Sequence, residues 1–238
     1  MSVSKGVVIY GQSRITYRVR EVDRKTLAIE VHPDQRVEVR APLHCDGEEI
    51  RRRVRKRAAW IQRQQDFFRS FEPRSPVRHY VSGETHAYLG RRYRLKWQLA
   101  DREGVKLDGG FLRVSMPGNA STEQARRLLR SWYRERAIEV FSKELEVCWN
   151  SFETMGVPKP ELHIRWMNRR WGSLSPRGRL TLNTELVQAP RECIAYVITH
   201  ELCHLRHPHH GPGFWKQLDR VMPDWAARKR KLEEKMAM

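Results

Sequence analysis

The chain has 238 residues, a length that suits one compact unit or two closely packed subdomains. No stretch approaches the ~20 apolar residues of a membrane-spanning helix, and residues 1–10 lack the charged start and apolar run of a signal peptide. The four cysteines form neither a disulfide framework nor a zinc-finger pattern, so we expect a protein of the reducing cytoplasm. The 46 Lys and Arg residues against 28 Asp and Glu residues give a net charge of +18, which attracts polyanions.

Alternating apolar and polar residues predict strands over residues 14–20, 27–31 and 37–40. A long amphipathic helix is predicted over residues 47–70, and Asp46 with Glu49 resembles a capping box at its start. Its apolar stripe consists of Ile50, Val54, Ala58 and Ile61. The densest basic run, from Arg51 to Arg57, then lies on the solvated face of this helix. From charge alone we expect weak, salt-sensitive and non-specific binding of nucleic acid.

After the basic helix, strand-like runs and segments of helical periodicity follow one another along the chain. Strands are predicted over residues 88–99, 111–116, 162–166 and 179–183. Helices are predicted over residues 121–152, 190–206, 212–222 and 224–237. No internal repeat is evident, and Pro117-Gly118-Asn119 marks a boundary. The order predicts an α+β protein with a β-rich N-terminal subdomain, residues 1–117, that includes the basic helix, and a second domain over residues 118–238.

Residues 200–204 have the pattern H-E-x-x-H on a predicted helix with an apolar stripe. His200 and His204 are one turn apart, with Cβ atoms roughly 5–6 Å from each other, so both imidazoles can bind one metal ion. Glu201 projects about 100° around the helix from His200 and can reach a water on that metal. Zinc peptidases need this arrangement of two nitrogen ligands, one open coordination site and one carboxylate base.

Zinc needs a third protein ligand, and three histidines follow the motif. His207 continues along the helix axis, away from the site, and would reach the metal only with distortion. His209 and His210 follow Pro208, where the chain can turn back. We favour His210, because Gly211 and Gly213 after it allow the backbone a close approach. His209 is then an exposed or outer imidazole.

Several ordered segments accompany the motif, and they carry a resemblance to a known family. They are Arg170-Trp171-Gly172-Ser173, Leu180-Thr181-Leu182-Asn183, Ala189-Pro190, the run from Tyr196 to Leu205, and His210-Gly211-Pro212-Gly213-Phe214-Trp215. Together they resemble the YgjP-like metallopeptidases, and the segment after His210 is also similar to SprT-type metalloproteases. The chain departs from the pattern at Leu174, where family members usually carry Cys.

The resemblance implies a zincin-like catalytic core that binds one zinc ion through His200, His204 and His210, with Glu201 as the catalytic base. Peptides or proteins are then the substrates. Trp171, Gly172 and Ser173 either flank the substrate cleft as an extended edge or belong to the core. His209, Arg170 and Tyr196 are alternatives for stabilising the oxyanion.

Two other functions compete with a zinc peptidase of this type. One is a SprT-like protease that acts on nucleic-acid-associated proteins, which the basic surface favours. The other is a non-catalytic module with a structural zinc site. Glu201 argues against the module, because a structural site has no use for a base and is usually closed by a fourth protein ligand.

Overall fold

The computed structural model describes residues 3–11, 13–24, 26–32, 35–69, 78–167 and 170–236. The chain forms two compact units, one up to residue 75 and one over residues 76–236. Both contain helices and strands, which confirms the predicted α+β class. None of the helices described has both the length and the apolar character needed to cross a membrane.

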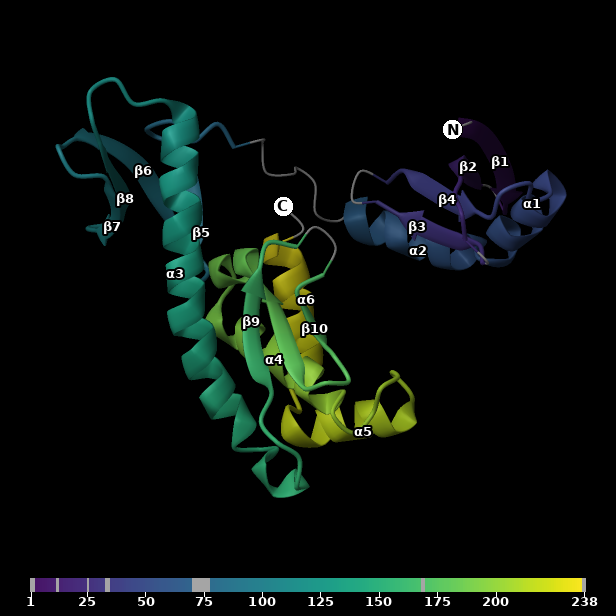
Figure 1. The fold of residues 1–238 in the computed structure, drawn as a ribbon. Helices are drawn as coiled ribbons and strands as arrows, with labels where there is room; N and C mark the ends of the chain where they lie inside the picture. Colours follow the sequence, from purple (N-terminus) through teal and green to yellow (C-terminus); the bar gives the residue numbers. More distant parts are fainter. Residues whose placement is uncertain are drawn as a thin grey trace. The chain divides into compact units, whose positions relative to one another are not determined.

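The first unit is a four-stranded sheet with two helices on one face (Figure 1). Its strands are β1 (Val3–Tyr10), β2 (Ser13–Glu21), β3 (Ala28–Val31) and β4 (Val37–Ala41), in the order β1-β2-β4-β3. The central pair, β2 and β4, is parallel, whereas β1 and β3 run antiparallel to their neighbours. Alternate residues of β2 and β4 face inward and meet the stripe at Ile50, Val54, Ala58 and Ile61, which is buried as predicted.

The long basic helix predicted over residues 47–70 is two helices, α1 (Gly47–Lys56) and α2 (Ala58–Arg69). Arg57 leaves the helical conformation between them, with φ −98° and ψ 5°. The Asp46 carboxylate caps α1 by accepting from the Glu48 N–H at 3.2 Å, whereas Glu49 pairs with Arg53 at 2.8 Å. The apolar stripe stays continuous across the break because both helices pack on the same sheet.

The second unit begins with another four-stranded sheet. Its strands are β5 (Thr85–Tyr88), β6 (Arg91–Leu99), β7 (Gly104–Asp108) and β8 (Phe111–Met116), in the order β5-β6-β8-β7. The single strand predicted over residues 88–99 is a hairpin, since Leu89 and Gly90 turn the chain at φ 49° and 79°. Strand order and strand sense repeat those of the first sheet, a duplication of topology that the sequence does not show.

A 28-residue helix, α3 (Thr122–Trp149), is about 42 Å long and organises the second unit. The β5–β8 sheet lies at one end of α3 (Figure 1). The remaining elements are η1 (Glu153–Met155), β9 (Glu161–Arg165), β10 (Gly172–Leu174), β11 (Arg179–Asn183), η2 (Thr184–Gln188), α4 (Arg191–Cys203), α5 (Pro212–Val221) and α6 (Trp225–Met236). Of these, β9, η2 and α4 pack along the rest of α3, and α5 and α6 pack against α4. The strands form a sheet of order β10-β11-β9, so β10 is an edge strand.

The two units divide the chain near residue 75, not at the boundary between residues 117 and 118 expected from the sequence. Pro117 and Gly118 form a tight connection inside the second unit. Leu112 and Met116 of β8 share one apolar core with Leu129 of α3, so the sheet and the helix cannot belong to separate units.

Candidate active site

The candidate site is built on α4, a helix buried on most of its surface. Apolar side chains at Ile194, Val197, Ile198 and Leu202 fix it against the core. The helix starts after Pro190 and its last residue is Cys203, with His204 as the C-cap in helical conformation. His200 and His204 therefore keep the one-turn spacing that the motif predicts, although the predicted helix end at residue 206 is three residues too late.

The structure brings three imidazoles together: His200, His204 and His210. One nitrogen of each ring lies within 4.8 Å of the corresponding nitrogens of the other two, and Nε2 of His200 is 2.9 Å from Nε2 of His210. His210 returns to α4 because α5 follows it at once. Phe214 of α5 is fully buried and packs its ring 4.6–4.9 Å from all three imidazole centroids. Trp215 holds the turn by donating its indole N–H to the His210 carbonyl at 3.1 Å.

The three rings suit a divalent metal ion chemically. Nδ1 of His204 lies 2.9 Å from the carbonyl oxygen of His207, which places the proton on Nδ1 and leaves the Nε2 lone pair free. Burial, with the neighbouring His210 and His204 rings, lowers the pKa of His200 to about 3. Burial also lowers the pKa of His210. Neutral imidazoles are the form that binds metal, and a set of three nitrogens with room for one more ligand fits zinc.

The other two histidines considered as third ligands stay outside this cluster. His207 packs its ring against Gly213, where an added Cβ would come within 2.9 Å of Cε1 of His207. The role of His207 is thus to support the turn through its carbonyl and its ring. His209 is exposed and does not join the histidine cluster in the part of the chain described.

Glu201 lies beneath the edge strand β10. Its side chain is 8% exposed, and burial raises its pKa to about 7 against the opposing effects of the Leu174 backbone N–H and Arg170. An added Cβ on Gly172 would lie 2.9 Å from Cγ and 3.0 Å from Oε1 of Glu201. The strand can approach the carboxyl group this closely only because residue 172 is glycine. The segment Trp171-Gly172-Ser173 is therefore next to the candidate base.

The amino-acid sequence matches the family model described as YgjP-like, metallopeptidase domain, over residues 25–235. The chain belongs to the YgjP-like metallopeptidase family. It is thus a peptidase, and a metal, usually zinc, is implied for it. A search of the curated proteins found no match.

Among solved structures, the metallopeptidase zymogen abylysin of Pyrococcus abyssi is 22% identical to this YgjP-like chain. The match covers 38% of this chain and 87% of that chain, with a TM-score of 0.34. The family assignment rests on the match over residues 25–235.

An aromatic row that sequence reasoning did not identify borders the histidines of this YgjP-like metallopeptidase. Tyr196, one turn before His200, stacks on Trp225 at 6.5 Å, and Trp225 stacks on Trp215 at 5.0 Å. Trp215 in turn stacks on His210 at 5.7 Å. The residues come from α4, α5 and α6, so no sequence spacing reveals the row. Of the three oxyanion alternatives, Tyr196 lies against His200 at 5.9 Å between ring centroids, and Arg170 acts electrostatically on Glu201.

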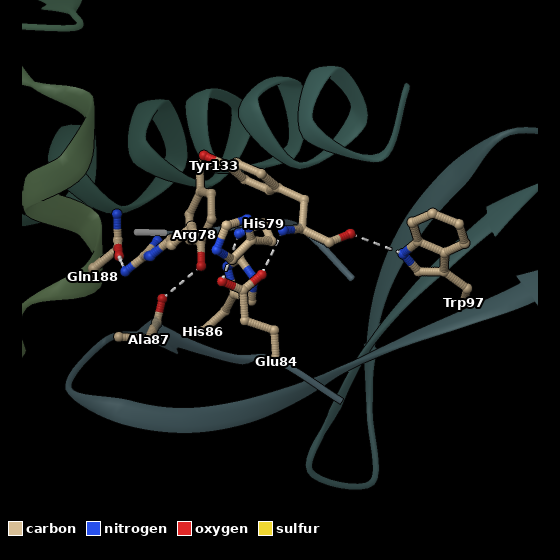
Figure 2. Close-up of polar contacts among 9 residues, drawn as sticks. Arg78, His79, Glu84, His86, Ala87, Trp97, Tyr133 and Gln188 are labelled. Atoms are coloured by element: carbon tan, nitrogen blue, oxygen red, sulfur yellow. Dashed lines mark hydrogen bonds and ion pairs between the residues drawn. The ribbon is translucent and has the colours of Figure 1, made fainter. Parts of the chain in front are cut away.

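A partly buried polar cluster connects β5 to the start of α4 (Figure 2). The Glu84 carboxylate accepts from the backbone N–H groups of His79 and Tyr80, at 3.0 and 2.6 Å, and lies 3.2 Å from Nε2 of the fully buried His86. Arg78 donates to the Gln188 side chain at 2.8 Å, two residues before Pro190.

The β5–β6 turn reinforces this connection. The N–H groups of Leu89 and Gly90 donate to the carbonyls of Val187 and Gln188 at 3.0 and 2.9 Å. An added Cβ on Gly90 would lie 2.7 Å from Cγ of Pro190. The first sheet of the second unit thus fixes the N-terminus of the helix that carries His200, Glu201 and His204.

Proposed function

We propose that this YgjP-like metallopeptidase is a zinc-dependent peptidase with a zincin-like core, in which His200, His204 and His210 bind one zinc ion and Glu201 is the general base. The observation that carries the proposal is the convergence of three imidazoles, two of them from the same stretch of α4 that carries the buried carboxyl group of Glu201. A purely structural site would gain nothing from Glu201, and a fourth protein ligand would close it.

Zinc, when bound, supplies a Lewis acid that polarises a carbonyl and lowers the pKa of water to about 7. Glu201 then accepts the proton of the attacking water and returns a proton to the leaving nitrogen. Its carboxyl group is suited to this because the Leu174 N–H and the close backbone at Gly172 restrict its position.

The edge strand β10 supports a mode of substrate binding. It pairs only with β11 in the described part of the chain, and its register puts Gly172 opposite Leu182 and Leu174 opposite Leu180. An extended peptide that adds to the free edge would lie beside Glu201, with backbone hydrogen bonds that do not depend on side-chain identity. We therefore propose extended polypeptide segments as substrates.

The proposal is tested with Glu201→Gln. The amide keeps the size and hydrogen-bonding capacity of the side chain but cannot accept the proton, so zinc content and fold are expected to stay unchanged. Cleavage of a labelled unfolded protein should fall by ~10²–10⁴-fold in kcat/KM. Zinc content by elemental analysis and turnover are measured on the same preparations. Unchanged turnover would make Glu201 a structural residue and the zinc site non-catalytic.

A further inference from the structure

The first unit contains a groove that has no part in the candidate active site. The cavity has a volume of about 880 Å³, and its lining comes from two places. Leu27, Ala28 and Ile29 contribute one part, and these residues include the start of β3. Because β3 is the last strand in the order β1-β2-β4-β3, its outer edge offers N–H and C=O groups without a strand partner among the described residues.

The other part of the lining is cationic. Arg52, Arg53, Lys56 and Arg57 project from α1 and its C-terminal end into the lining. Arg52 and Arg53 share one carboxylate, that of Glu49, and are 77% and 58% exposed. Lys56 and Arg57 form no ion pair with the residues that the structure describes. The groove thus keeps uncompensated positive charge next to a free strand edge.

The groove also has an apolar side. Trp60 of α2 lines it and packs, with Leu27 and Ile29, against the apolar core of the first unit. A ligand that matches the whole groove needs backbone groups for the strand edge, negative charges for the cations, and an apolar side chain for Trp60. Single-stranded nucleic acid matches the cations and the aromatic ring but leaves the strand edge unused. An extended acidic polypeptide matches all three.

We propose that this groove binds an extended acidic segment of polypeptide by strand addition to β3, and so recruits protein substrates to the peptidase. The recruiting role rests on the proposed function, whereas the binding itself does not. Strand addition supplies affinity through the backbone, and the cations select acidic segments.

A labelled decapeptide of alternating glutamate and valine tests the groove. Its binding to the full chain carrying Glu201→Gln, in which cleavage is expected to be strongly slowed, is followed by fluorescence polarisation at about 0.15 M salt. The double variant Lys56→Glu/Arg57→Glu should weaken binding by about tenfold or more. The matched control Arg55→Glu/Arg63→Glu changes the charge equally at exposed positions of α1 and α2 outside the lining, and should stay within about twofold. Circular dichroism verifies the fold of both.

Two further probes separate strand addition from charge alone. The same peptide with N-methyl groups at alternate residues keeps its charge but cannot pair as a strand, so it should not bind detectably. Decathymidylate at equal concentration should not displace the peptide. Three outcomes would each overturn the proposal. They are equal weakening of peptide binding by both double variants, undiminished binding of the methylated peptide, and displacement of the peptide by the oligonucleotide. Binding is measured without turnover. The binding result therefore stays interpretable even if the peptidase proposal fails.

Discussion

At the scale of single residues, the site depends on which histidine returns to α4. His210 lies beside His200 and His204, whereas His209, one residue earlier, stays outside the cluster, although both are exposed. The difference arises from the turn that Phe214 and Trp215 hold in place. Adjacent imidazoles with the same chemistry therefore have different expected roles.

Zinc content is expected to separate these two residues. His210→Ala and His204→Ala should each lose tight zinc, since two nitrogens hold the ion far more weakly than three. His209→Ala should keep about one zinc ion per chain. Elemental analysis after dialysis against a weak chelator measures all three variants in parallel. Loss of zinc in the His209 variant alone would move the third ligand to His209.

A second residue-scale prediction concerns Gly172. In Gly172→Ala the new methyl group would lie 2.9 Å from Cγ of Glu201 and 3.1 Å from Cγ1 of Val197. Either the strand β10 or the carboxyl group of Glu201 must therefore shift. A displacement of about 1 Å at a catalytic group can cost ~10²-fold, and we expect a loss approaching that size in kcat/KM with zinc retained. Thr181→Ala, on the neighbouring strand β11, is the control and should stay near wild-type activity. Equal activity of the two variants would show that β10 does not hold the base in place.

At the scale of elements, α4 is held at its N-terminus by the β5–β6 hairpin and the polar cluster around Glu84 and His86. His86 is fully buried, and its Nδ1 has no hydrogen-bond partner among the described residues. Burial, with a smaller effect from Arg78, lowers the pKa of His86 below its ordinary value although Glu84 acts in the opposite direction. The folded protein therefore favours the neutral imidazole at this position.

This cluster predicts a loss of stability in acid. The folded state binds the His86 proton more weakly than the unfolded state, so the stabilisation is complete above a pH of about 6.5 and is lost as the pH falls below it. His86→Gln retains a donor near Glu84 but does not titrate. Its free energy of unfolding should therefore fall less between pH 7 and pH 5 than that of the wild type.

Urea unfolding followed by tryptophan fluorescence measures this difference. Seven of the eight tryptophans lie in the second unit, so the signal reports mainly on the unit that contains His86. A chelator in every sample removes zinc binding from the comparison. Identical pH slopes for the two proteins would show that His86 is not responsible.

At the scale of the whole molecule, the net charge of +18 is expected to give weak binding to nucleic acid without sequence preference. Binding of a random oligonucleotide should be measurable at about 50 mM salt and lost by about 200 mM. Because this attraction comes from the total charge, Lys56→Glu/Arg57→Glu and Arg55→Glu/Arg63→Glu should reduce it equally. Electrophoretic mobility shifts over a salt series provide the measurement. A clear sequence preference, or retention at high salt, would contradict a purely electrostatic origin.

The sequence by itself determined the local parts of this protein. The spacing of His200 and His204 on α4, the strands β8 and β11, and the ends of α3 within a few residues all follow from periodicity and capping, which act over one or two turns. The sequence also decides the family, because the ordered segments typical of that family are present in the amino-acid sequence itself. The break at Arg57 was missed because the apolar stripe continues through it.

Only the tertiary structure decided which distant residues meet. Gly172 and Glu201 are 29 positions apart in the sequence, and their contact exists because β10 pairs with β11 above α4. The border between the units lies near residue 75 because β8 and α3 bury their side chains in one core, which a Pro-Gly turn cannot reveal. Such contacts depend on the packing of whole elements, and local sequence preferences carry no information about that packing.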